Sequence, residues 1–277
     1  MSARSRWIQQ NQQLAHIAFD LLEPCAPRMH QATAPVFRES SPGTLESIGS
    51  AVLLNLGDEP LVLSAAHVLD DATTDTPLYV GMHDSVRRVE GRWFRTPIPK
   101  SGLRQDDPVD VGIARLPRGA LSDFDRDSFL SVGELAPFRR LDEGSYAVVT
   151  GYPCKKQRWT RHLEREANLY TITAACSGIE DYRKLGVDRS HAVVLGFDQK
   201  RSWTREGQRT APKLKGVSGG GLWVLGRPNT DQEPVARLAG IFIEWHAGNV
   251  KRIVATRIEV LLSGVWGHWP ELRAFLP

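Results

Sequence analysis

Residues 211–224 read Ala-Pro-Lys-Leu-Lys-Gly-Val-Ser-Gly-Gly-Gly-Leu-Trp-Val. Four glycines surround Ser218 in this stretch: Gly216, Gly219, Gly220 and Gly221. Dense glycine followed by an apolar run predicts a tight turn that presents one side chain ahead of a buried strand. Glycine also leaves backbone N–H groups uncovered, so those of Gly216 and Ser218 are candidates to stabilise an oxyanion. The simpler alternative is a glycine-rich hairpin whose serine is only small and polar.

Two upstream motifs supply the groups that a serine hydroxyl needs to become a nucleophile. His67 ends the stretch Leu-Val-Leu-Ser-Ala-Ala-His, and Asp110 enters the stretch Val-Asp-Val-Gly-Ile-Ala-Arg-Leu. A histidine accepts the serine proton, and a carboxylate orients the histidine. Asp106 and Asp107 are alternative orienting carboxylates. They belong to a polar loop, whereas Asp110 lies at the start of a predicted strand, and this favours Asp110.

The three motifs together resemble those of trypsin-like serine peptidases of the chymotrypsin fold, in particular the disulfide-poor bacterial members. The stretch that ends at His67 resembles the family's Thr-Ala-Ala-His, and the one around Asp110 resembles its Asp-Ile-Ala-Leu-Leu strand. Gly216-Val217-Ser218-Gly-Gly resembles Gly-Asp-Ser-Gly-Gly. The order His67, Asp110, Ser218 is also the family's order. The resemblance covers residues 45–257.

The resemblance implies a serine endopeptidase that hydrolyses peptide bonds through an acyl-enzyme intermediate. Ser218 would be the nucleophile, His67 the general base and Asp110 the residue that orients His67. The backbone N–H groups of Gly216 and Ser218 would form the oxyanion hole.

The strand pattern and the resemblance predict an all-β fold of two six-stranded antiparallel Greek-key barrels, with N-terminal and C-terminal helices. Short strands recur between turn residues without a βαβ rhythm, which argues against a parallel sheet. Apolar spacing over residues 5–22 predicts an amphipathic helix that Pro24 and Pro27 end, and a C-terminal helix is expected to break at Pro270. The expected segments are an N-terminal helix and connector (1–44), a peptidase domain (45–257) with first barrel (45–118) and second barrel (140–257), and a C-terminal helix (258–277).

Composition limits the expected partners and location. A net charge of +3 over 277 residues is too small to argue for nucleic acid, and the basic stretch Lys155–Arg165 is interpreted as a solvated loop. No apolar run approaches the roughly 18 residues of a membrane span, and no signal-peptide core is visible. Three cysteines, Cys25, Cys154 and Cys176, cannot all pair. We therefore expect reduced thiols in a cytoplasmic protein with neither a nucleic-acid nor a membrane partner.

The substrate pocket is encoded less clearly than the catalytic motifs. By resemblance, Pro212 occupies the position at which trypsin carries the acid that selects Arg or Lys, so a strict Arg/Lys preference is not expected. The residues expected to border the pocket are Pro212, Ile243, Glu244, Trp245 and Ile253. Strand alternation does not decide whether Glu244 points inward and attracts a basic side chain.

Val217 bears on regulation. Zymogen-type members of the family have an aspartate at this position, which pairs with a new N-terminus after cleavage. Val217 cannot make that ion pair, so this switch cannot operate here. We expect a protein partner to activate or restrain the enzyme, besides the protein or peptide that it cleaves.

Other functions remain as alternatives. The main one is a catalytically silent trypsin-like fold that binds peptides or proteins. An esterase with the same triad would need a closed apolar pocket in place of an extended cleft beside an edge strand. Cys154 precedes two lysines and is a second candidate nucleophile, but it lacks a glycine turn. The sequence has no HExxH or paired-cysteine motif, so we expect no metal and no other cofactor.

Overall fold

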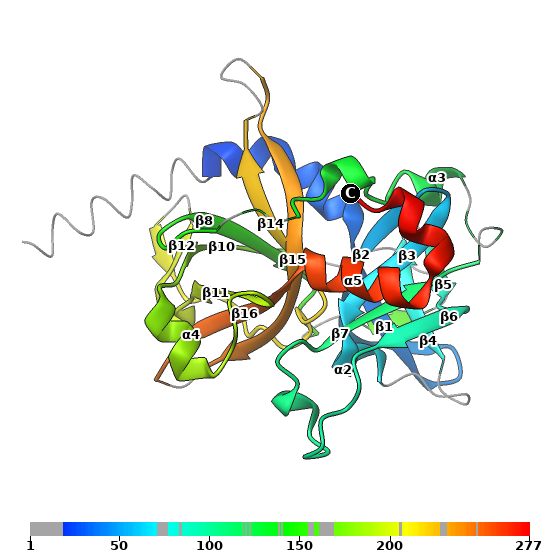
Figure 1. Ribbon diagram of the computed structural model, residues 1–277, viewed down its shortest axis with the longest axis horizontal. Helices are drawn as coiled ribbons and strands as arrows, with labels where there is room; N and C mark the ends of the chain where they lie inside the picture. Colours follow the sequence, from blue (N-terminus) through cyan, green and yellow to red (C-terminus); the bar gives the residue numbers. More distant parts are fainter. Residues whose placement is uncertain are drawn as a thin grey trace, which may run out of the picture.

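The computed structural model describes residues 19–70, 77–82, 85–117, 119, 121, 123–137, 139, 141–154, 158–160, 169–204, 207–227, 232–247 and 249–277. Figure 1 shows two β-sheets side by side, with helices on their outer surface and across their junction. Every strand pair is antiparallel. The described fold is therefore mainly β, as the sequence predicts.

The first sheet has the strand order β5-β4-β1-β2-β3-β7-β6, with β9 paired to β2. Its strands are β1 (Thr33–Ser41), β2 (Thr44–Leu56), β3 (Glu59–Ala65), β4 (Leu78–Met82), β5 (Ser85–Arg88), β6 (Arg92–Arg95), β7 (Val111–Arg115) and β9 (Arg158–Thr160). These eight strands exceed the predicted six, because the long β2 extends past β3 and leaves residues 44–46 free to pair with β9. The described pairings leave this sheet open.

The first sheet also begins earlier than the expected boundary at residue 45. β1 pairs with β2 from Thr33↔Val52 to Ser41↔Thr44, so residues 33–41 belong to the sheet and not to a connector. Pro35 does not prevent pairing, because β1 contains register irregularities and proline is tolerated where a ladder hydrogen bond is not needed.

The second sheet is a closed six-stranded barrel with the ring order β10-β11-β16-β15-β14-β8. Its strands are β8 (Tyr146–Gly151), β10 (Tyr170–Cys176), β11 (Ala192–Gly196), β14 (Gly221–Gly226), β15 (Val235–His246) and β16 (Arg252–Arg257). β8, β10 and β11 follow one another around the ring, and the last three strands return beside them in reverse order. This closure confirms the predicted second barrel. A small hairpin of β12 (Ser202–Thr204) and β13 (Gly207–Arg209) lies outside it.

The helices are short, except at the two ends of the described chain. The elements are a helix over 19–32, α2 (Ala66–Leu69), α3 (Asp123–Arg126), α4 (Ile179–Leu185), α5 (Ile258–His268) and the 3-10 turns Arg104–Asp106, Val132–Glu134, Gln199–Arg201 and Pro270–Phe275. α5 lies across the junction of the two sheets in Figure 1 and buries Ile258, Leu261 and Val265 there. Pro270 begins the turn that follows α5, so the predicted C-terminal helix and its break are confirmed.

The N-terminal helix ends later than the sequence predicts. It continues through Pro24 and Pro27 to residue 32, although each proline removes one helical donor. Cys25, Met29 and Ala32 are buried in the core between the sheets, and this packing offsets the lost hydrogen bonds. Residues 5–18 of the predicted helix lie outside the described residues. No described helix has the length and hydropathy of a membrane span.

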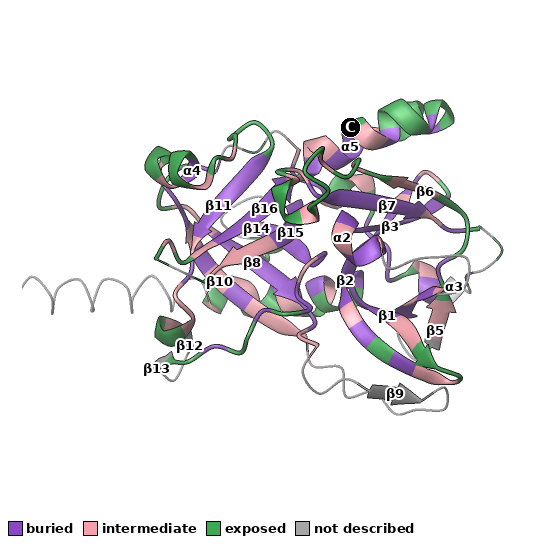
Figure 2. Ribbon diagram, turned by 90° about the horizontal axis from the view of Figure 1, so that it is seen from below, coloured by how far each residue is buried: buried purple, intermediate pink, exposed green. Residues whose placement is uncertain are grey.

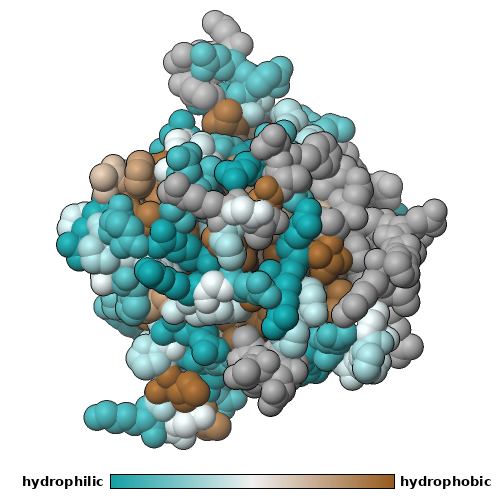
Figure 3. Space-filling model, turned by 90° about the vertical axis from the view of Figure 1, so that its right-hand side faces the viewer, coloured by the Kyte–Doolittle hydropathy of each residue, from teal (hydrophilic) through white to brown (hydrophobic). Residues whose placement is uncertain are grey.

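The buried residues are concentrated in the strands of the two sheets. In Figure 2, purple strands fill the middle of both halves, and exposed green segments are concentrated in helices and loops. On the face shown in Figure 3, hydrophilic residues predominate and hydrophobic ones form separate small patches. Single exposed apolar residues of this kind are normal for a protein surface.

A buried polar network joins the N-terminal helix to both sheets. Thr33 Oγ1 donates to Met29 O at 2.8 Å and lies 3.0 Å from Thr150 Oγ1. The indole N–H of Trp223 donates to Thr150 Oγ1 at 2.8 Å. Thr33, Thr150 and Trp223 are at most 1% exposed, so Thr150 satisfies groups that water cannot reach.

We expect Thr150→Val to lower the free energy of unfolding by about 2 kcal/mol, because it leaves the buried Trp223 N–H without an acceptor. Urea denaturation measures the change. Thr171→Val is the control, since Thr171 is only partly buried. Equal stability of Thr150→Val and wild type would contradict the role of the network.

Candidate active site

The pairing of β3 with β7 brings His67 next to Asp110. Ala65 at the end of β3 lies opposite Val111 at the start of β7, so the residue just before β7 faces the turn just after β3. His67 lies in that turn, in α2. Its backbone N–H donates to Asp110 Oδ1 at 3.0 Å, and its Nδ1 lies 2.5 Å from Asp110 Oδ2. The Asp110 side chain is 8% exposed and that of His67 39%, so the carboxylate is buried and the imidazole is accessible.

The two alternative carboxylates do not contact His67. Asp106 is exposed on a 3-10 turn. Asp107 accepts hydrogen bonds from the Thr96 hydroxyl at 2.6 Å and from Val109 N at 3.0 Å. Asp110 is therefore the carboxylate that contacts the imidazole, as its position at the start of a strand predicts.

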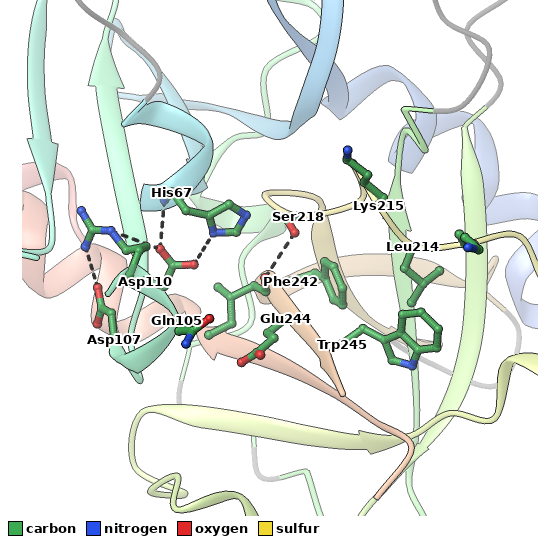
Figure 4. A pocket seen from close by; sticks show the side chains of 13 residues that line it. His67, Gln105, Asp107, Asp110, Leu214, Lys215, Ser218, Phe242, Glu244 and Trp245 are labelled. Atoms are coloured by element: carbon green, nitrogen blue, oxygen red, sulfur yellow. Dashed lines mark hydrogen bonds and ion pairs between the residues drawn. The ribbon is translucent and has the colours of Figure 1, made fainter. Parts of the chain in front are cut away.

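Ser218 comes from the second sheet, in the turn directly before β14. Figure 4 shows the imidazole of His67 turned toward Ser218, and both residues line one pocket. The Ser218 hydroxyl donates to the carbonyl oxygen of Ile243 at 3.2 Å. The structure thus brings the three predicted residues to one site, with the hydroxyl bonded to β15 and not to the imidazole.

The backbone of the serine turn leaves two N–H groups free. Lys215 O accepts from Cys154 N at 2.8 Å, and the N–H of Gly216 points the opposite way, because it belongs to the same trans peptide. Val217 O accepts from Gly220 N at 2.9 Å, which turns the N–H of Ser218 away in the same manner. Within the described part of the chain, neither N–H donates to another group.

The glycines of this turn are required by packing. Gly216 and Gly219 have φ of +93° and +87°, a region that other residues rarely adopt. A Cβ at Gly219 would collide with Ser50 O and Ser64 Oγ, and one at Gly216 with the backbone and thiol of Cys154. The glycines that identified Ser218 in the sequence are therefore needed because the turn packs closely against Ser50, Ser64 and Cys154.

Ser50 is a site residue that the sequence did not reveal. It is fully buried on β2, and its backbone N–H donates to Ser218 O at 2.8 Å. Its hydroxyl donates to Gly216 O at 2.8 Å and accepts from Tyr152 N. Ser50 therefore fixes both carbonyls that flank the free amides. Nothing in the sequence around Ser50 distinguishes it from other serines in strands, so the sequence did not identify it as a site residue.

The pocket beside Ser218 has a volume of about 420 Å³. Ile243, Glu244 and Trp245 line it, as expected from the sequence. Pro212 and Ile253 do not: Pro212 is exposed outside the pocket, and Ile253 points into the core of the closed barrel, where it is fully buried. Missed residues that also line it are Arg104, Gln105, Lys213, Leu214, Lys215 and Phe242.

The polar groups that line the pocket include two lysines and a glutamate. Glu244 Oε2 lies 3.1 Å from His246 Nε2, so one of its carboxylate oxygens already has a partner. Lys213 and Lys215 form no ion pair with any described residue. The indole N–H of Trp245 is buried and has no partner among the described residues. Ammonium groups only donate, so Lys213 and Lys215 favour a substrate group that accepts hydrogen bonds.

The cysteines show no sign of a nucleophile. All three are free: Cys25 and Cys176 are buried, and Cys154 is partly buried. Burial raises the pKa of the Cys154 thiol, and this outweighs the opposing effects of Ser47 and Lys215. Burial also raises the pKa of Cys176 to about 11. A raised pKa reduces the thiolate fraction, so Cys154 is not activated. No group of three or more His, Cys, Asp or Glu within the described residues is arranged to hold a metal ion.

The comparisons with known proteins bear on the fold. A solved structure of neuropsin, a serine protease expressed in the limbic system of mouse brain, matches with a TM-score of 0.56 and 19% sequence identity. The match covers 88% of this chain and 96% of neuropsin. No family model matches the sequence, and the search of curated proteins returned no match. The chain therefore has the two-sheet, chymotrypsin-like fold of trypsin-like serine proteases.

We expect Gly219→Ala to lower the free energy of unfolding by about 3 kcal/mol or more, because the methyl group meets backbone at a positive φ. Thermal unfolding followed by circular dichroism measures the loss. Gly267→Ala in α5 is the matched control: it has open space around it and gains about 0.5–1 kcal/mol from helix propensity. Equal stability of the two variants would show that the turn tolerates a side chain.

Proposed function

We propose that this protein is a serine endopeptidase. The observation that carries the proposal is that the His67–Asp110 pair and Ser218 line one pocket, with two free backbone N–H groups in the turn that holds Ser218. A nucleophile, a base oriented by a carboxylate and an oxyanion site are the parts that acyl transfer requires.

The reaction begins with transfer of the Ser218 proton to Nε2 of His67 as Oγ attacks the scissile carbonyl. Asp110 holds Nδ1–H of His67 and stabilises the imidazolium that forms. The N–H groups of Gly216 and Ser218 donate to the oxyanion, and one such donor contributes roughly 3–4 kcal/mol in subtilisin. His67 then protonates the leaving amine, and water hydrolyses the acyl-enzyme by the same steps in reverse.

An edge of β15 favours a peptide over a small ester as the substrate. β15 pairs with β14 only up to Ile241, while its later residues pair with β16 on the other side. The segment from Ile243 to His246 therefore has one side without a strand partner, beside Ser218. An extended peptide can pair with such an edge and place its carbonyl at the serine.

The resting bond of Ser218 supports a restrained enzyme. Its hydroxyl is held by Ile243 O, and a substrate N–H paired with that carbonyl would displace it toward His67. Val217 is fully buried in the second sheet and carries no charge for activation by a new N-terminus. We propose that substrate, or an activating protein partner, releases the serine. The three free thiols support a cytoplasmic location.

The bond to Ile243 also favours one alternative, a catalytically silent fold that binds peptides. Labelling with a fluorophosphonate separates the two functions, because it requires a nucleophilic serine and an oxyanion site. We expect covalent labelling of the wild-type chain, complete loss in Ser218→Ala and retention in Ser263→Ala, a surface control on α5. Cleavage of a proteome-derived peptide library should fall about 10³-fold or more in Ser218→Ala. Binding of the same peptides without labelling or cleavage would establish the silent fold.

The donor-rich pocket gives a prediction about substrates. We expect cleavage beside acidic or amide side chains to exceed cleavage beside Arg or Lys, because the ammonium groups of Lys213 and Lys215 favour acceptors. Lys213→Glu should reduce the preference for acidic side chains about 10-fold, a change typical of one charge contact. Library cleavage followed by mass spectrometry measures it, with Lys184→Glu on α4 as the control. A library profile dominated by Arg and Lys would contradict this assignment of the pocket.

A further inference from the structure

The carboxylate of Asp110 has an unusual set of hydrogen bonds. Oδ1 accepts from the backbone N–H of His67, and Oδ2 is bonded to Nδ1 of the same residue. The described residues offer the carboxylate no other hydrogen-bond donor. Its only hydrogen bonds therefore go to the residue that it has to orient, so something else must fix its position.

Arg104 is the nearest charged group to this carboxylate on the side away from His67. Its Nε lies 4.0 Å from Asp110 Oδ1, and its side chain is 14% exposed. A two-point hydrogen bond to Asp70, at 2.7 Å from Nε and 3.0 Å from Nη2, holds the guanidinium. Nη1 donates to Asp107 Oδ2 and to Thr96 O, each at 2.9 Å. Weaker contacts of Nη1 with Thr96 Oγ1 and Pro97 O bring the acceptor atoms to six, next to a buried carboxylate.

Asp107 connects Arg104 to the backbone next to Asp110. Besides Arg104 and Thr96, it accepts at 3.0 Å from the backbone N–H of Val109, the residue before Asp110. Burial alone would raise the pKa of Asp107, but these donors lower it below its usual value, so the residue is held as an anion. Asp110 has φ of +41°, which is uncommon for a residue with a side chain. Asp107 holds the backbone in that conformation and so sets the direction of the Asp110 side chain.

We propose that Arg104, held by Asp70 and Asp107, is a positioning residue of the catalytic centre that fixes Asp110 and sets the charge balance at His67. The proposal rests on the proposed function, since it assigns Arg104 a part in the same reaction. The guanidinium contacts neither Ser218 nor the reacting carbonyl. It acts through Asp110.

The charges around His67 and Asp110 determine in which direction Arg104 affects protonation of His67. Arg104 and Arg95 are the cations on the side of the first sheet, and Asp70 and Asp107 are the anions that face them. Across the pocket, the charged groups are Lys213, Lys215 and Glu244, the last paired with His246. The Arg104 cation opposes formation of a second cation on His67. Its removal favours the imidazolium, so the acid limb of the pH–rate profile moves to higher pH.

Two substitutions separate charge from geometry. Arg104→Gln removes the cation, and Arg104→Lys keeps it but loses the two-point contact with Asp70. For Arg104→Gln we expect kcat to fall about 10-fold, KM to stay within about twofold, and the acid limb of kcat/KM to move up by about 0.5–1 pH unit. For Arg104→Lys we expect a smaller fall in kcat and an unchanged acid limb. Arg183→Gln, an exposed arginine on α4, is the control and should behave as wild type.

A second measurement does not depend on turnover. In the Ser218→Ala background, the ring proton on Cε1 of His67 is followed by NMR as pH is varied, with and without Arg104→Gln. We expect its titration midpoint to move to higher pH by the same 0.5–1 unit. An unchanged midpoint together with unchanged kcat would overturn the proposal. A shifted midpoint in a chain that never cleaves peptides would support the role of Arg104 and refute the protease. If Arg104→Gln does not fold, the comparison of Arg104→Lys with wild type decides: a kcat equal to wild type would overturn the proposal.

Discussion

The site depends on hydrogen bonds between the two sheets. His67 and Asp110 belong to the first sheet and Ser218 to the second, so neither sheet holds a complete site. Ser50 on β2 binds the carbonyls of Gly216 and Ser218, and Thr256 on β16 donates to Val109 O, next to Asp110, at 2.5 Å. The first sheet thus binds the backbone of the Ser218 turn, and the second sheet binds the backbone just before Asp110. Buried hydrogen bonds of this kind are costly to break, and they fix the distance between His67 and Ser218.

In this structure the Ser218 hydroxyl is bonded away from the imidazole of His67. The amides of Gly216 and Ser218 are free, and the imidazole is oriented by Asp110. The Ser218 hydroxyl donates instead to Ile243 O, on the edge of β15 that an extended peptide would occupy. A substrate N–H and the Ser218 hydroxyl would therefore compete for one carbonyl oxygen, so that binding of substrate releases the serine. For the proposed protease, this arrangement would be a physical basis for restraint without a zymogen switch.

Much of the fold and the core of the site could be predicted, because they depend on local patterns. Glycines at positive φ mark the turn of Ser218, and an aspartate entering an apolar strand marks Asp110. The predicted ends of elements were less accurate. Pro24 and Pro27 indicate a helix end, yet buried Cys25 and Met29 keep the helix continuous. Pro35 similarly concealed β1, whose pairing with β2 is visible only in the sheet.

The sequence by itself determined the three side chains that meet at the pocket and the tight glycine turn, because each is set by residue type and by its immediate neighbours. Only the tertiary structure decided which groups support them. Ser50, Arg104 and Asp107 are ordinary polar residues in the sequence, and their partners lie up to 166 positions away. The pocket was likewise decided by the barrel, which turns Ile253 into the core and leaves Lys213 at the opening. Long-range pairing sets the surroundings of a side chain, and no local pattern encodes it.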